Sequence, residues 1–265
     1  MNGRLVFPVA HSPLIDKYSG EYTNAQVIIN TKHRNMSVMV QIKSPDKEVE
    51  KKVDSEIKTM GIDRGINNIV ILSNNMFFNA GRLRSIKGRY RHNRSELQHA
   101  GTRSARRKLK ELSGRERRFV QDTNHVISKK IVNLHFDVIA LEDLESAGMR
   151  KKNNGKRFNT MIGTWSPFQL EQFMEYKAHE RGKTVIYINP RYTSQGCSSC
   201  GYTDKNNKKG SIFHCLNCNL ELHADLNAAR NIGILGKSEY FRLLSTSQWM
   251  RHPDSNKHFP SGRGS

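Results

Sequence analysis

The stretch that decides the fold reads Gly61-Ile62-Asp63-Arg64-Gly65-Ile66-Asn67-Asn68-Ile69-Val70-Ile71-Leu72. It is typical of a buried strand, yet Asp63 interrupts it. Glu142 ends a second apolar run that begins at Val138, and Asp225 opens a helix-like segment. Carboxylates at the ends of three elements can converge on a pair of Mg²⁺ ions, which prefer oxygen ligands and clamp both oxygens of a breaking phosphodiester. The trio predicts a metal-dependent nuclease, although a single such carboxylate is more often a helix cap or a surface residue.

The composition points to a polyanionic partner. The chain has 265 residues, a net charge of +20 and a pI near 10.0, which favours nucleic acid or an anionic membrane. No apolar run approaches the length of a membrane-spanning helix, and the first residues lack the apolar core of a signal peptide. We therefore expect a cytoplasmic protein that binds nucleic acid and not a membrane.

The positive charge is concentrated between Arg82 and Arg118. This segment holds 14 lysines and arginines against 3 glutamates, a net charge of +11. A solvated helix face is the ordinary explanation for a charge run, but this excess would repel itself strongly without a polyanion. We predict contacts with phosphates rather than base edges, with Arg103, Arg106, Arg107 and Lys108 as the candidate residues.

All four cysteines lie in two C-x₂-C pairs, Cys197 with Cys200 and Cys215 with Cys218. Two such pairs can complete a tetrahedron around one Zn²⁺, and four thiolates leave no open position, so the predicted zinc is structural. Two disulfides in a secreted protein are the alternative, which no export signal supports. His214 and His223 flank the pairs and are interpreted as ordinary polar residues, with phosphate contact open to them.

The order of elements favours an α/β domain. Residues 61–72 and 75–80 are predicted to form a hairpin, followed by a basic helical segment broken at Gly88 and Gly101. The other predicted elements are strands at 24–30, 36–42, 137–142 and 184–188, helices from Arg115 to Asn133 and from Pro167 to Arg181 with Phe168 in the core, a loop over 146–164, a helix after Asp225, and a loosely ordered tail over 237–265. This order fits a ribonuclease-H-like fold, but order alone does not separate it from other α/β domains.

Four motifs carry a resemblance to a known family. They are residues 61–65 (GIDRG), 141–144 (LEDL), 192–201 (YTSQGCSSCG) and 224–232 (ADLNAARNI). Together they resemble the TnpB transposon-encoded proteins, relatives of the type V CRISPR effectors. The resemblance implies a RuvC-type domain with an inserted zinc ribbon, catalytic residues Asp63, Glu142 and Asp225 with Mg²⁺, and zinc ligands Cys197, Cys200, Cys215 and Cys218.

By this resemblance the activity is cleavage of DNA directed by a guide RNA from the transposon end. The implied organisation is a remnant of a wedge-like β domain (1–58), a RuvC-like domain (59–192) with a basic helical segment (82–134), a zinc ribbon (193–220), the last RuvC-like helix (221–236) and a tail (237–265). Only 62 residues precede Asp63, where the family usually has well over a hundred, so we expect the helical recognition lobe to be missing. A non-cleaving regulator of transposition and an inactive truncated fragment are the competing functions.

Overall fold

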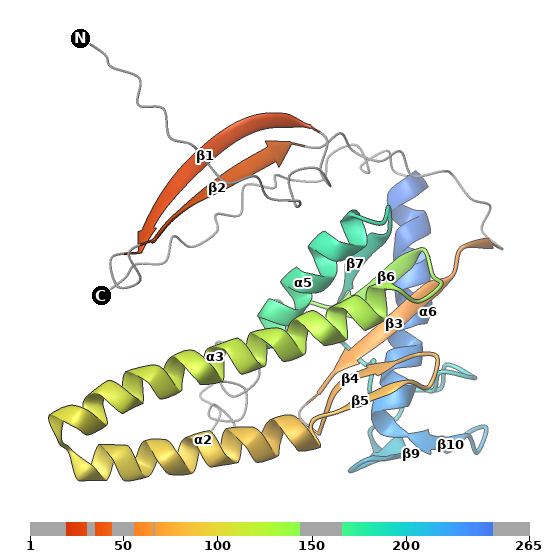
Figure 1. Ribbon diagram of the computed structural model, residues 1–265. Helices are drawn as coiled ribbons and strands as arrows, with labels where there is room; N and C mark the ends of the chain where they lie inside the picture. The colour runs from red at the N-terminus through yellow and green to blue at the C-terminus, as the bar shows by residue number, and fades with distance from the viewer. Residues whose placement is uncertain (1–19, 31–34, 44–55, 66, 144–165, 246–265) are drawn as a thin grey trace. The chain divides into compact units, whose positions relative to one another are not determined.

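The computed structural model describes residues 20–30, 35–43, 56–65, 67–143 and 166–245 (Figure 1). The chain divides into two compact units, Met1–Glu50 and Lys51–Ser265. The predicted loop over 146–164 and the last twenty residues of the predicted tail lie outside the described residues.

The first unit contains a two-stranded hairpin. Strand β1 (Glu21–Asn30) pairs antiparallel with β2 (Asn35–Lys43), in a register that sets Val27 opposite Val38. The two strands predicted at 24–30 and 36–42 are confirmed, each slightly longer than expected.

A five-stranded sheet forms the centre of the second unit, in the order β5-β4-β3-β6-β7. Its strands are β3 (Thr59–Arg64), β4 (Asn68–Leu72), β5 (Phe77–Asn79), β6 (Val138–Glu142) and β7 (Thr184–Ile188). The first three are antiparallel neighbours, whereas β6 runs parallel to both β3 and β7. The α/β prediction is confirmed.

The prediction of one strand across residues 61–72 is wrong, because the chain turns between β3 and β4. The Gly65 amide donates to the Ile69 carbonyl across this turn (3.4 Å). Glycine and asparagine are favoured in turns, so Gly65 and Asn67 outweigh the strand preference of their apolar neighbours. Asp63 therefore lies next to the end of a strand rather than in the middle of one.

A long helical hairpin follows the sheet's first edge (Figure 1). Helix α2 (Gly81–Ala100) passes through Gly88 without a break, so the break predicted there is wrong. Gly101, at φ +63°, does end the helix as predicted. Helix α3 (Arg103–Val132) then begins twelve residues before the predicted start, because the Thr102 side chain accepts a hydrogen bond from the Ala105 amide (3.1 Å) and caps it.

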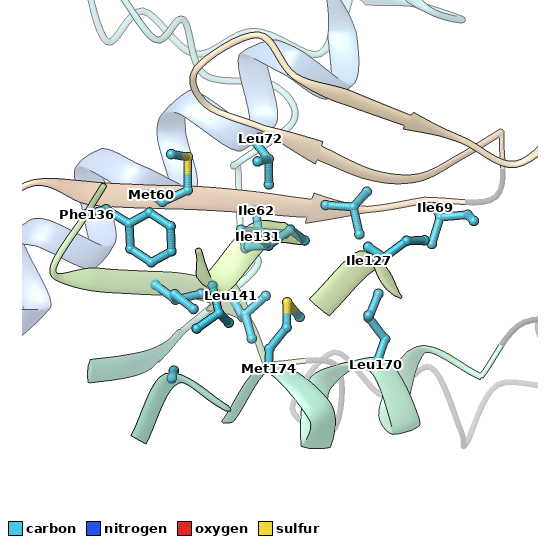
Figure 2. Close-up of a cluster of buried hydrophobic side chains, with 14 of the residues drawn as sticks. Met60, Ile62, Ile69, Leu72, Ile127, Ile131, Phe136, Leu141, Leu170 and Met174 are labelled. Atoms are coloured by element: carbon cyan, nitrogen blue, oxygen red, sulfur yellow. The ribbon is translucent and has the colours of Figure 1, made fainter. Parts of the chain in front are cut away.

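Helices cover both faces of the sheet. On one face, Ile62 and Leu141 pack with Ile131 of α3 and Met174 of α5 (Pro167–His179), as Figure 2 shows. On the other face, alternate strand residues such as Val138, Ala140, Ile186 and Ile188 pack against α6 (Ala224–Ser245). Burial on both faces explains why the strands have few polar residues.

Two helix details differ from expectation. Phe168, predicted to be in the core, is 46% exposed, because it lies on the outer side of α5 while Leu170 and Met174 are buried. Helix α6 continues past residue 236 to Ser245, so residues 237–245 of the predicted tail are helical. Tyr240, buried against the sheet, anchors this extension.

Candidate active site and metal centre

Strand alternation directs two of the three predicted catalytic side chains to the α6 face. In β3 and β6, Ile62 and Leu141 are register partners and both face α3 and α5. Their neighbours Asp63 and Glu142 must then face the opposite side, since successive side chains of a strand alternate. The parallel register places these two carboxylates next to each other at the carboxyl ends of adjacent strands.

Glycines on both elements bring α6 close to this edge. A Cβ atom on Gly61 would lie 2.0 Å from the Ala229 carbonyl oxygen, and one on Gly236 would lie 2.2 Å from the Ala140 Cβ. The same atom would lie 3.6 Å from Thr59 Cγ2, at the start of β3, whereas Ala229 lies against Gly61 further along the strand, so α6 runs antiparallel to β3. Asp225, one turn before Ala229, therefore lies toward Asp63.

The electrostatics of Asp63 agree with this convergence. Burial, and after it the charges of Glu142 and Asp225, raise the pKa of Asp63 to about 7, against smaller opposing effects of Lys208 and Arg64. Burial also raises the pKa of Glu142. The positive charges near these carboxylates do not offset their burial and mutual repulsion. A divalent cation, which prefers oxygen ligands, would stabilise the charged carboxylates. The residues present therefore fit a divalent metal.

Side chains that the sequence prediction missed surround the carboxylates. Thr193 donates its hydroxyl to Glu142 Oε1 (2.6 Å), and Arg64 joins the Glu142 carbonyl oxygen to the carboxylate of Glu171 on α5. Lys208 lies on β8 (Lys208–Lys209), a strand of the cysteine region, and its charge lowers the pKa of both Asp63 and Glu142. Arg64 and Thr193 stand within two of the four family motifs, but nothing local signals their distant partners.

The four cysteines come together as predicted. Their sulfur atoms all lie within 4.8 Å of one another, with 3.6 Å between Cys197 and Cys218 and between Cys200 and Cys215. A tetrahedron of sulfurs at about 2.3 Å from a zinc ion would have edges of about 3.8 Å. All four cysteines are free thiols, so the disulfide alternative is not what the structure has.

Each pair forms the same knuckle. Gly201 and Asn219 follow the two pairs at φ +76° and +58°, and their amides donate to the Cys197 and Cys215 carbonyls. The prediction that Gly201 suits such a turn is confirmed, and Asn219 does the same in the second knuckle. Hydrogen bonds with the Tyr202 backbone and the Asn217 side chain lower the pKa of Cys200, whereas the pKa of Cys218 is raised, against a backbone hydrogen bond with Leu220, by burial and by hydrogen bonds with the other cysteines.

A small sheet supports the knuckles, in the order β10-β9-β8. It consists of β8, β9 (Ile212–His214) and β10 (Glu221–His223), with Phe213 fully buried beside Cys197 and Cys215. Neither His214 nor His223 is part of the cysteine cluster. The ring of His223 packs edge-on against Phe77, and its Nδ1 is 4.0 Å from an Asp225 oxygen.

The predicted phosphate-binding residues lie away from the carboxylates. Arg103, Arg106, Arg107 and Lys108 are all exposed in the first part of α3. The sheet-contacting part of that helix includes Ile127 and Ile131, roughly 30 Å further along at about 1.5 Å per residue. The structure therefore holds the basic residues on a projecting hairpin (Figure 1), and does not place them in the acidic site. Of the helices it describes, none has the length and apolar character to cross a membrane.

Two family models match the chain. One, described as "Probable transposase", covers residues 37–153, and the other, described as "Cas12f1-like, TNB domain", covers residues 168–232. The first spans β2 through β6, and the second spans α5, the cysteine region and the start of α6.

Individual relatives agree with these matches. The chain is 40% identical to the CRISPR-associated endodeoxyribonuclease Cas12f1 of Sulfoacidibacillus thermotolerans, over 48% of this chain and 29% of that protein. It is 36% identical to a TnpB-like protein of Methanocaldococcus jannaschii, over 47% of this chain and 45% of that protein. The matched parts are thus less than half of either relative.

The fold is also similar to a solved structure, the cryo-EM structure of a Cas12f1-sgRNA-target DNA complex. The TM-score is 0.55 at 20% identity, over 79% of this chain and 55% of that one. The predicted fold class, a RuvC-type α/β domain with an inserted cysteine ribbon, is thereby confirmed. The chain has a fold similar to that of Cas12f1, and its sequence is similar to those of TnpB-like and Cas12f1 proteins. The predicted resemblance is thereby confirmed.

Proposed function

We propose that this chain carries the nuclease centre of a transposon-associated, RNA-guided DNA endonuclease of the TnpB type. The observation that carries the proposal is the convergence of Asp63, Glu142 and Asp225 from β3, β6 and α6. Three elements far apart in sequence supply carboxylates to one edge of the sheet, where strand ends in α/β proteins commonly hold ligands.

Asp63, Glu142 and Asp225 would hold Mg²⁺, with Asp63 between the other two. Two bound Mg²⁺ ions would supply an activated water and stabilise the leaving 3′ oxygen of the phosphodiester. The protein's own part is to fix the donors: the parallel register holds Asp63 beside Glu142, and the glycine contacts hold α6 against β3. Lys208 adds a positive charge near the same edge, where a substrate phosphate would sit.

The cysteine cluster is proposed to hold one structural Zn²⁺. Four sulfurs at near-tetrahedral spacing fill every position of such an ion, which leaves none for substrate. Its role is then to fold the ribbon, because the four thiolates and the small Phe213 core would be too little to order this segment alone.

The basic hairpin of α2 and α3 is proposed to bind the phosphates of DNA and of a guide RNA from the transposon end. Its exposed arginines lie on one projecting helical hairpin, and the solved structure of similar fold is a complex with RNA and target DNA. The alignments cover less than half of the length of the Cas12f1 and TnpB-like relatives. Binding of a guide RNA and choice of the DNA target by this chain are therefore proposed here as well.

The decisive experiment compares Asp63→Asn with Asp122→Asn. The first removes a charge from the proposed site, and the second makes the same chemical change on the exposed face of α3. Protein co-expressed with the transposon-end RNA is given guide-matched DNA and Mg²⁺, and binding and cleavage are measured side by side. We expect both variants to bind as the wild type does and only Asp63→Asn to lose cleavage.

Two results would count against the proposal. Cleavage that survives in Asp63→Asn would show that the acidic trio is not the nuclease centre. Binding without cleavage by the wild-type protein would favour the non-cleaving regulator of transposition instead.

A further inference from the structure

Thr193, a loop residue, makes a side-chain hydrogen bond to a carboxylate outside its own loop. The residue is 4% exposed, and its hydroxyl lies 2.6 Å from Glu142 Oε1 and 3.0 Å from the Pro190 carbonyl oxygen. A hydroxyl has one hydrogen to donate, and a carboxylate is the stronger acceptor at the shorter distance. The hydrogen bond to Glu142 is therefore the principal one.

Two asparagines of α6 hold the backbone of the loop that carries Thr193. Asn231 donates to the carbonyl oxygens of Thr193 (2.8 Å) and Gly196 (2.7 Å). Asn227, fully buried, donates to the same Gly196 oxygen (2.7 Å) and accepts from the Ser198 amide (2.9 Å). The two asparagines are four positions apart, so they act from one face of the helix that also carries Asp225.

The same loop leads directly into the first cysteine knuckle. Gly196 precedes Cys197, and Ser198 lies inside the pair. A further asparagine, Asn207, is buried; it donates to the Gln195 carbonyl (3.0 Å) and accepts from the Leu216 amide of the second knuckle (3.1 Å). A continuous set of hydrogen bonds therefore runs from both knuckles to Glu142.

We propose that Thr193 is a positioning residue for Glu142, and that Asn227 and Asn231 connect its placement to the folded cysteine ribbon. The inference rests on the proposed function of the acidic trio and extends it. In this arrangement the ribbon does more than fold itself: through the loop 193–198 it fixes the orientation of one cation-binding carboxylate. Groups that orient a metal ligand in this way commonly contribute about 10- to 100-fold to metal affinity.

The ordinary alternative is that Thr193 only stabilises its loop through Pro190. The two roles make different predictions for substitutions. Thr193→Ser keeps the hydroxyl, whereas Thr193→Val keeps the shape and loses the donor. Thr203→Val is the matched control, because that ribbon threonine is exposed and its hydroxyl donates to the nearby Gly201 carbonyl (3.2 Å) rather than to a carboxylate.

The test measures Mn²⁺ binding to zinc-loaded protein without nucleic acid, by isothermal titration and electron paramagnetic resonance. Mn²⁺ prefers oxygen ligands, so the thiolates of the ribbon do not compete for it. We expect Thr193→Val to weaken binding by about 10-fold or more, and Thr193→Ser and Thr203→Val to stay within about 3-fold of the wild type. Asn231→Ala should weaken binding as Thr193→Val does, with zinc content unchanged.

Thermal unfolding and zinc content are recorded for every variant, and Thr193→Ala replaces Thr193→Val if the latter does not fold. Wild-type affinity in Thr193→Val, or equal losses in the serine and valine variants, would overturn the inference. Asp63→Asn distinguishes a failure of this inference from a failure of the proposed function. If that variant binds Mn²⁺ as the wild type does, the assignment of Asp63, Glu142 and Asp225 as a cation-binding site is wrong.

Discussion

Gly61→Ala is the sharpest test of how this fold assembles its site. The added methyl group would lie 2.0 Å from the Ala229 carbonyl oxygen, 2.3 Å from the Gly233 amide nitrogen and 2.7 Å from the Gly233 Cα. All three atoms belong to the backbone of α6, so no side chain can rotate away. Helix α6 must move outward by roughly 1.5 Å for these atoms to reach ordinary van der Waals distance.

The cost follows from what that movement separates. Helix α6 packs on one face of the sheet and buries residues that include Val138, Ala140 and Ile186. Overpacking a well-packed core costs about 1–3 kcal/mol and sometimes more. Because the obstacle here is backbone, we expect the free energy of unfolding to fall by about 3 kcal/mol, a large part of the roughly 5–15 kcal/mol that stabilises a typical domain. Asp225 moves with the helix, so Mn²⁺ affinity should fall as well.

Urea unfolding followed by circular dichroism measures this change, with Gly88→Ala as the control. A Cβ on Gly88 meets nothing within 4 Å, and alanine is favoured over glycine inside a helix by about 0.5–1 kcal/mol. The control should therefore be slightly more stable than the wild type. A free energy of unfolding for Gly61→Ala within about 0.5 kcal/mol of wild type would refute the close approach of α6 to β3.

Three further outcomes are expected. Cys215→Ser should reduce bound zinc from one per chain to nearly none in elemental analysis and unfold the ribbon, because Cys215 is a buried member of the cluster; full zinc retention would contradict this. Replacing Arg103, Arg106, Arg107 and Lys108 with alanine should reduce the slope of log K against log[salt] by roughly 0.7–0.9 for each phosphate that the protein no longer neutralises, and an unchanged slope would locate the phosphates elsewhere. In protein without Mg²⁺, the pKa of Asp63 is raised from 3.8 to about 7, so its contribution to stability is full below its ordinary pKa and disappears as the pH rises through about 7. Asp63→Asn should then be more stable than the wild type at pH 8, by on the order of 1–2 kcal/mol after allowance for partial exposure, and the gain should shrink at pH 5; an equal difference at both values would contradict the raised pKa.

The sequence alone predicted the features that depend on local chemistry. Residues 184–188 and 138–142 are apolar and rich in β-branched side chains, so they form strands in almost any α/β context. The cysteine spacing predicted one four-sulfur cluster, because two residues between thiols is the reach of a knuckle. The candidate carboxylates were recognisable because Asp63 and Glu142 stand in or at the end of apolar runs and Asp225 opens a helix-like segment.

Local signals failed where several weak preferences compete. The apolar residues from Ile62 to Leu72 hid the turn at Gly65, and the charged start of α3 has too few apolar residues to show a helical period. The turn and the Thr102 cap decided these boundaries, and both effects are small for each residue.

Only the tertiary structure decided which groups meet. The convergence of Asp63, Glu142 and Asp225 depends on the parallel register of β3 with β6 and on glycines that let α6 approach the sheet. Thr193 reaches Glu142 across 51 residues of sequence, and Asn231 reaches Thr193 across 38. Hydrogen bonds require partners within about 3 Å in space, and a pattern of neighbours along the chain carries no information about partners so far apart in it.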